Sequence, residues 1–307
     1  FRAYHSRDIE FLDYRTYSGR NVYSRSLCFL LYKAALDIFP DCKVVMRRPI
    51  SKGFFCSIDK CDGNPLSARD IDLIKARMRE IVEEDIQFHR HEVQIAEAID
   101  VFRKLGHFDK VKLLETCGEV YISYYTLGGT ADYYYDVLVP SSGYLKIWDL
   151  TPYRNGALLR VPDRHHPEQL APFHEQPKTF EAFSETIKWN SIMGLDNVGD
   201  VNKACLDGKA TDLIQVAEAL QEKKIVQIAE EIDKRYRSPQ KVRIVLITGP
   251  TSSGKSTFCK RLSVQLMTCG LHPISFSTDD YFVNRLDTPK LPDGSYDFDN
   301  FDTVDHA

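Results

Sequence analysis

The sequence predicts an α+β N-terminal domain followed by the start of an α/β domain of the phosphate-binding-loop (P-loop) class. Three observations lead to this expectation. Apolar helical stripes and β-rich runs alternate irregularly over residues 24–148, which is typical of an α+β domain. A long amphipathic stripe over 211–236 then ends at Ser238-Pro239. Directly after that break, an apolar run at 242–248 leads into a glycine-rich loop.

Composition and charge narrow the class of protein. The 307 residues are 43% hydrophobic and 27% charged, which excludes disordered, collagenous and coiled-coil classes, and this length predicts about two domains. The formal charge is −4, from 40 Lys and Arg against 44 Asp and Glu. This charge argues against a protein whose main role is to wrap nucleic acid, although a local basic face stays open. The chain has no long apolar run, no signal-peptide character and eight dispersed cysteines. We therefore expect a cytoplasmic protein without a membrane partner.

The first elements follow from local patterns. Residues 24–38 are apolar on most sides and predict a buried helix that ends before Phe39. Extended segments are expected around 43–47 and 53–58, separated by Pro and Gly. Ser67, with Asp70 three residues later, predicts a capped helix whose apolar stripe runs from Ile71 to Val82.

The middle of the chain continues this mixture. A second helix is expected from Val93 to Leu105, and strands are expected from Val111 to about Trp148 because Tyr, Val, Ile and Thr accumulate there. Residues 162–178 have no periodicity and predict a loop, in which the histidines are more simply surface residues than metal ligands. Thr211 begins the long amphipathic helix, whose stripe is most simply a packing face.

The glycine-rich loop carries the clearest chemistry. Gly249 to Ser256 form a full G-x-x-x-x-G-K-S between a predicted strand and a helix stripe that ends at Gly270. Backbone N–H groups of such a loop point at phosphate oxygens, Lys255 can reach the β- and γ-phosphates, and the Ser256 hydroxyl can bind Mg²⁺. We predict ATP and Mg²⁺ as cofactors, with ATP bound by Gly249, Pro250, Thr251, Ser252, Ser253, Gly254, Lys255, Ser256 and Thr257.

A second strand is predicted at 272–277, and it ends in Thr278-Asp279-Asp280. An acid at the carboxyl end of a parallel strand beside a P-loop lies in the ligand crevice. There Asp279 could take a proton from a substrate hydroxyl or hold Mg²⁺ through water, and we predict Asp279 and Lys255 as the catalytic pair. The alternative is a turn with solvated charges.

The three motifs GPTSSGKS, FSTDDYF and YDFDNFDTVD, in this order, resemble the uridine kinase and phosphoribulokinase family of P-loop kinases. The resemblance implies that Asp279 is the base on a nucleoside 5′-hydroxyl and that Asp299 contacts the ribose hydroxyls. It also implies that Tyr281 and Phe282 lie beside the substrate. Residues 240–307 correspond only to the opening part of such a domain, so we expect the 307-residue chain itself to turn over no nucleoside.

The N-terminal part resembles the second additional (editing) domain of threonyl-tRNA synthetases. The residues that carry the likeness lie in 25–41, 47–59, 67–105 and 139–143. In that family the domain binds a metal through His-x3-His and Cys-x3-His. The corresponding positions here are Arg25, Phe29, Tyr134 and Leu138. We therefore expect no zinc site and no editing chemistry, but a domain retained for binding or structure.

Together, the two resemblances predict how the chain divides into domains. We expect the tail of a TGS-like domain at 1–14, the synthetase-like domain at 15–185, a helical connector at 186–239 and the truncated kinase part at 240–307. This order resembles bacterial proteins described as uridine or nucleoside kinases.

Three functions fit these patterns. The leading hypothesis is ATP-dependent phosphorylation of a uridine- or cytidine-like nucleoside 5′-hydroxyl by the full-length protein, with a small nucleoside rather than tRNA as the partner. One alternative is an RNA- or tRNA-binding or sensing protein whose nucleotide-binding domain is a switch. Another is a kinase of a different small alcohol or a sugar phosphate. The charge of −4 favours a kinase, while tRNA affinity and oligomeric state stay open.

Overall fold

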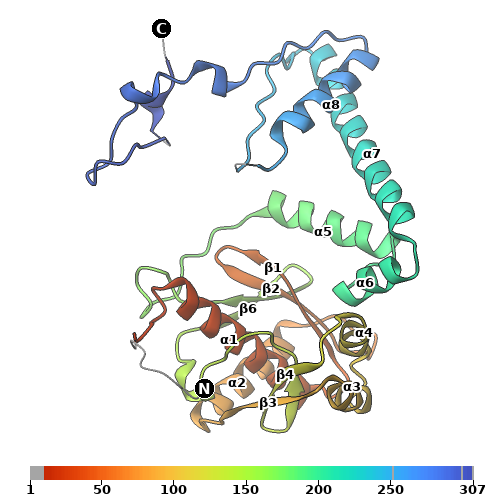
Figure 1. Ribbon diagram of the computed structural model, residues 1–307, viewed down its shortest axis with the longest axis vertical. Helices are drawn as coiled ribbons and strands as arrows, with labels where there is room; N and C mark the ends of the chain where they lie inside the picture. Colours follow the sequence, from red (N-terminus) through yellow and green to blue (C-terminus); the bar gives the residue numbers. More distant parts are fainter. Residues whose placement is uncertain (1–9, 251, 299, 306–307) are drawn as a thin grey trace. The chain divides into compact units, whose positions relative to one another are not determined.

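The computed structural model describes residues 10–250, 252–298 and 300–305 (Figure 1). The chain divides into two compact units, with the boundary between Ala210 and Thr211. The first unit is a mixed α+β structure with two antiparallel sheets, as predicted for the N-terminal part. None of the helices in the described ranges is long and apolar enough to cross a membrane.

Two helices form one side of the main core of the first unit. Helix α1 (Tyr17–Ile38) is capped by the Thr16 hydroxyl, which accepts a hydrogen bond from the Gly19 N–H at 3.1 Å. Helix α2 (Ala68–Glu83) starts with the predicted capping box between Ser67 and Asp70. Both predicted helices are therefore confirmed, although α1 begins seven residues earlier than the range 24–38. The fully buried side chains that these helices contribute are Leu27, Phe29, Leu30, Leu31, Ile71, Ile74, Met78 and Ile81.

A four-stranded antiparallel sheet packs against these helices in the order β1-β2-β7-β6. Its strands are β1 (Lys43–Ile50), β2 (Gly53–Asp59), β6 (Asp149–Tyr153) and β7 (Gly156–Arg160). Gly53 is required where β2 meets β7, because a Cβ there would lie 2.6 Å from the Leu159 carbonyl oxygen. Helix α5 (Pro177–Ile192) adds Phe180 and Phe183 to a separate cluster around Phe55.

A three-stranded sheet, in the order β3-β4-β5, separates the main core from a smaller one. Its strands are β3 (Phe88–Gln94), β4 (Tyr121–Leu127) and β5 (Thr130–Asp132). The smaller core lies under α3 (Ile95–Lys104) and α4 (Phe108–Thr116), and α6 (Val198–Leu206) packs on α4.

Two boundaries in this region differ from the predictions. The expected helix 93–105 begins only at Ile95, because Val93 and Gln94 pair with β4 as the end of β3. The strands expected from Val111 onward begin only at Tyr121, since 108–116 is helical. Val111 and Leu114, three residues apart, are both buried, and this spacing favours a helix over a strand.

The second unit is built on two helices, α7 (Ala210–Arg237) and α8 (Lys255–Thr268). They pack through Ile225, Ala229, Leu262 and Leu266, and Gln265 donates a hydrogen bond to Glu222 at 2.7 Å. The predicted helices over 211–236 and after the glycine-rich loop are therefore confirmed.

The predicted parallel strands of the second unit are not formed among the described residues. Segments 242–248 and 272–277 are irregular, and Ile244, Leu246, Ile274 and Phe276 are 76–88% exposed. Both strand predictions are wrong for a physical reason. A strand buried on both faces exists only when neighbouring strands satisfy its backbone, and the described residues place no strand beside either segment.

The exposure of segment 242–248 and the burial of the contact between α7 and α8 lead to a prediction about stability. Leu246, 88% exposed, should tolerate replacement by alanine with a change in unfolding free energy within about 0.5 kcal/mol. Leu262, 3% exposed between α7 and α8, should lose about 2–5 kcal/mol on the same replacement. Urea unfolding followed by far-UV circular dichroism measures both, and an equal loss for the two variants would mean that segment 242–248 is buried in solution.

Candidate functional site

The glycine-rich loop of the second unit adopts the backbone conformations that its sequence allows. Ser252 and Gly254 have positive φ angles of 59° and 84°, and the Ser253 N–H donates to the Pro250 carbonyl at 3.2 Å. At Gly249 a Cβ would lie 2.8 Å from the Ser253 hydroxyl oxygen, so the loop leaves no room for a side chain at this position. A turn that contains left-handed residues can direct neighbouring N–H groups to one side, which makes an anion-binding concavity.

Lys255 is held over this loop. Its Nζ donates to the carbonyl oxygens of Gly249 at 2.8 Å and of Pro250 at 2.9 Å. Lys255 is also the first residue of α8, where unpaired N–H groups and the helix dipole favour an anion. The loop, the ammonium group and the helix N-terminus therefore fit a phosphate chain.

A groove of about 690 Å³ adjoins the loop. Thr248, Ser253, Gly254, Lys255 and Thr257 line it on the loop side, and Arg261 adds a second cation. Its opposite wall is apolar and includes Ile228 of α7 and Phe258 of α8. Ser256, the predicted Mg²⁺ ligand, lies exposed in the first turn of α8, and Thr251 lies outside the described residues.

The predicted substrate residues lie on a different segment. Asp279 belongs to a 3₁₀ turn, Thr278–Tyr281, and its N–H donates to the Ser277 hydroxyl at 3.3 Å. Within the described ranges, no hydrogen bond or ion pair joins Asp279 to Lys255 or to Ser256. The structure thus does not bring the predicted catalytic pair together.

Tyr281 and Phe282 instead pair with the third motif. The Asp305 N–H donates to the Tyr281 carbonyl at 2.7 Å, and Phe282 forms an antiparallel bridge with Val304. The rings of Tyr281 and Phe282 are half-exposed. Asp299, predicted to contact a ribose, lies outside the described residues.

The four positions that correspond to metal ligands in the synthetase family lie together in the first unit. Phe29 and Tyr134 have ring centroids 5.4 Å apart, and Leu138 packs on the same core. Arg25 donates through Nη2 to the Val137 carbonyl at 3.2 Å and pairs with Asp136 at 2.9 Å. Aromatic packing and a guanidinium–carboxylate pair therefore connect α1 to the segment 134–138.

A polar cluster that sequence reasoning missed lies beside these residues. The Tyr32 hydroxyl is 2.9 Å from His107 Nε2, and Lys110 Nζ is 3.2 Å from Asp132. Burial, together with the Asp132 carboxylate, raises the pKa of the Cys28 thiol to about 12. These residues come from α1, from the start of α4 and from β5, so no local sequence pattern predicts that they lie together.

His107 makes the stability of the first unit depend on pH. Burial lowers the pKa of His107, although Asp132 and Asp109 act in the opposite direction. Its Nδ1 is buried without a hydrogen-bond partner among the described residues. Because the folded state resists protonation, the stabilisation is complete above the usual histidine pKa of about 6.5 and is lost as the pH falls below that value.

We therefore expect the unfolding free energy of the wild-type chain to fall between pH 7.5 and pH 5.5, and this fall to be smaller in His107→Gln. His165→Gln, in an exposed loop, is the matched control. Urea titrations at the two pH values measure the difference, and an unchanged pH dependence in His107→Gln would contradict the assignment.

Comparison with known proteins shows what the chain is similar to. No family model matches it. It is 32% identical over 149 residues to a threonine–tRNA ligase of Fusobacterium nucleatum, a match that covers 48% of this chain and 24% of the ligase. A threonine–tRNA ligase of Carboxydothermus hydrogenoformans is 33% identical over 151 residues, which cover 49% and 22% of the two chains. A ligase of the same name from Geobacter sp. is 28% identical over 143 residues.

These matches confirm the synthetase-like module and correct the leading functional hypothesis. The chain spans less than a quarter of the length of the ligases, and each match is longer than the second unit, so it includes part of the first. The relatives are consistently named as tRNA ligases, so the predicted nucleoside kinase activity is wrong, and the tRNA-related alternative agrees better with them.

Proposed function

We propose that this chain is an RNA-binding protein that recognises tRNA and carries a nucleotide-binding loop in its second unit. The similarity to threonine–tRNA ligases is the observation that carries the proposal. The first unit supports it, because its two sheets and its helices enclose two packed cores and can present a rigid surface to a ligand.

The proposed role of the first unit is binding rather than editing. At the positions of the family's metal ligands, Phe29 and Leu138 offer only carbon atoms, and the Arg25 guanidinium is a cation that repels a metal. Tyr134 is buried, and burial raises the pKa of its hydroxyl well above the ordinary value, so it stays protonated at neutral pH. These four side chains do not fit a zinc ion.

The proposed ligand of the second unit is a nucleoside triphosphate with Mg²⁺. The positive φ angles in the loop, the anchored Lys255 amine and the N-terminus of α8 support this proposal. The backbone N–H groups of the loop, which Pro250 lacks, would surround the phosphates, Lys255 would neutralise charge, and the Ser256 hydroxyl would contact the ion. The nucleotide would act as a switch on RNA affinity, in keeping with the sensing alternative.

Fluorescence anisotropy with labelled bulk tRNA tests the proposal. We expect binding that weakens steeply as salt rises from about 50 to 200 mM, because cations on the protein displace counterions from phosphates. A DNA duplex of similar charge is the control and should bind more weakly. Equal affinity for tRNA and for the duplex, or no binding at about 50 mM salt, would contradict tRNA recognition.

A further inference from the structure

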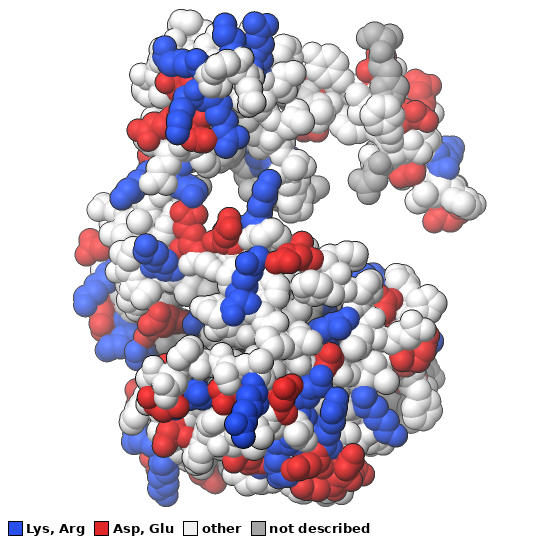
Figure 2. All heavy atoms as spheres, turned by 180° about the vertical axis from the view of Figure 1, so that it is seen from behind, with Lys and Arg blue, Asp and Glu red and all other residues white. Residues whose placement is uncertain are grey.

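The end of α7 and the turn that follows it concentrate positive charge. Residues 234–243 contain five Lys and Arg and no Asp or Glu, within a chain whose net charge is −4. All five side chains are exposed. Figure 2 shows several Lys and Arg side chains, with Asp and Glu among them, at the upper left of the view, where this end of the second unit lies. We call Lys234, Arg235, Arg237, Lys241 and Arg243 the basic patch.

Two of the five cations, Lys241 and Arg243, have no opposite charge beside them among the described residues. Arg235 pairs with Glu231 at 2.7 Å and Arg237 with Asp233 at 2.8 Å, so these two arginines are compensated. The hydrogen bond from Arg235 lowers the pKa of Glu231, and the charge of Lys234 lowers it as well. In the part of the chain that the structure describes, the side chains of Lys241 and Arg243 form no ion pair or hydrogen bond. A helix dipole accounts for cations in the last turn of α7, but Lys241 and Arg243 lie beyond that turn.

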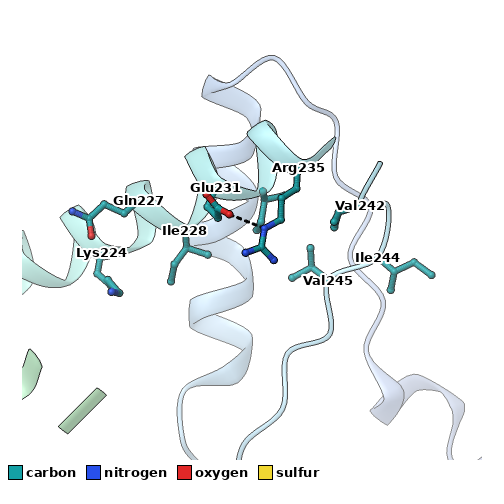
Figure 3. Close-up of a pocket in the computed structure, with 9 residues that line it drawn as sticks. Lys224, Gln227, Ile228, Glu231, Arg235, Val242, Ile244 and Val245 are labelled. Atoms are coloured by element: carbon teal, nitrogen blue, oxygen red, sulfur yellow. Dashed lines mark hydrogen bonds and ion pairs between the residues drawn. The ribbon is translucent and has the colours of Figure 1, made fainter. Parts of the chain in front are cut away.

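An apolar groove of about 480 Å³ opens beside the patch. Ile228 and Ile232 of α7 form one wall, and Val242, Ile244 and Val245 form the other. Figure 3 shows Arg235 on α7 with its guanidinium beside Glu231, and Val242, Ile244 and Val245 on the segment across from it. Ile244 is 77% exposed, so its apolar side chain is accessible to a ligand that enters the groove.

We propose that the basic patch and this groove form an RNA-binding surface in the second unit. Lys234, Lys241 and Arg243 contact phosphates of a single-stranded segment, and the groove takes an unstacked base. A flexible RNA strand presents the required combination, a row of negative charges with planar apolar bases between them. The inference rests on the proposed function and adds to it a second RNA contact, outside the synthetase-like unit.

Two double variants, each of which removes two cations, test whether the basic patch binds RNA. Lys241→Ala/Arg243→Ala removes two patch cations, and Lys223→Ala/Lys260→Ala removes two exposed cations elsewhere in the same unit. With labelled tRNA, the patch variant should bind at least about tenfold more weakly near 0.1 M salt. Its plot of log affinity against log salt should be shallower by about 1.4–1.8. The control should stay within about twofold of wild type, and equal losses in both variants would overturn the proposal.

A second pair of variants tests the groove. Ile244→Asp places a carboxylate in the groove, whereas Ile274→Asp makes the same change at a position that is 79% exposed and outside it. We expect Ile244→Asp to weaken tRNA binding at least about fivefold more than Ile274→Asp, since a carboxylate repels phosphate and an apolar wall is lost. Equal effects of the two substitutions would overturn the groove as a base-binding site.

The outcomes separate this inference from the proposed function. If wild-type chain has no affinity for tRNA, the proposed function fails. If wild type binds tRNA and the patch variant keeps the same affinity and salt slope, only this inference fails. Poly-glutamate at equal charge concentration should not displace tRNA from the wild-type chain; displacement that is lost in the patch variant would overturn RNA in favour of an acidic protein as the partner.

Discussion

Replacing Lys255 by alanine is expected to weaken nucleoside triphosphate binding by roughly 10–150-fold, because a hydrogen bond to a charged group contributes about 1.5–3 kcal/mol. The physical reason lies in the anchored position of the amine. Its hydrogen bonds to the Gly249 and Pro250 carbonyls hold the charge at the loop before a ligand arrives, so little side-chain entropy is lost on binding. Equilibrium titration with a fluorescent ATP analogue in the presence of Mg²⁺ measures the effect.

Lys260→Ala is the matched control, since Lys260 lies exposed on the same helix but away from the groove. Its nucleotide affinity should stay within about twofold of wild type. Loss of the two loop hydrogen bonds could also loosen the loop, so the circular dichroism of both variants is compared at 25 °C. A Lys255→Ala variant that keeps its helix content and still binds the analogue with wild-type affinity would contradict the phosphate-binding assignment.

Local patterns in the sequence predicted α1, α2, α3, α7 and α8, but assigned α4 to a strand and gave no signal for α5. The Ser67–Asp70 capping box, the stripe of α2 and the helix after the glycine-rich loop depend on residues a few positions apart, and all three are present. The strands predicted at 242–248 and 272–277 depend on partners elsewhere in the chain. Their β-branched composition is compatible with a buried strand, but composition cannot supply the neighbouring strand that satisfies the backbone.

The candidate sites likewise divide into one that local sequence predicts and one that depends on contacts between distant elements. The glycine-rich loop could be located from eight consecutive residues, because its chemistry is local. The cluster of Tyr32, His107, Lys110 and Asp132 could not, since it forms only when α1, α4 and β5 meet. Asp279 illustrates the opposite error. A motif implied that it faces the phosphates, whereas in the structure its N–H donates a hydrogen bond to the Ser277 hydroxyl.

Net charge was one of the arguments for the kinase hypothesis that the comparisons contradict. A total of −4 favoured a small-molecule ligand over RNA, but phosphates respond to the cations within a Debye length of about 10 Å rather than to the sum over the chain. The carboxylates of Glu231 and Asp233 are already paired with arginines, and the charge of Lys234 also acts on Glu231. Lys241 and Arg243 are therefore the cations of the basic patch left uncompensated among the described residues. A window of ten residues would have shown this patch where the total did not.

The largest effect on stability is expected for Phe29→Ala. Phe29 is fully buried in the main core of the first unit, and its ring lies 5.8 Å from Phe88 and 5.4 Å from Tyr134. Truncation of such a side chain costs about 3–5 kcal/mol, and each kcal/mol lowers the melting temperature of a unit this size by about 2–4 °C. Phe11→Ala, at a position 97% exposed, is the control and should stay within about 0.5 kcal/mol of wild type.

Tryptophan fluorescence makes this measurement specific, because both tryptophans of the chain, Trp148 and Trp189, belong to the first unit. Phe29 stands where the synthetase family has a metal ligand, so here aromatic packing connects α1 to the segment 134–138 in place of coordination. If the Phe29–Tyr134 contact joins α1 to the segment 134–138, Phe29→Ala should be strongly destabilised. Added zinc should not restore the lost stability. A variant as stable as Phe11→Ala, or one rescued by zinc, would show that something other than the Phe29–Tyr134 contact connects the two segments.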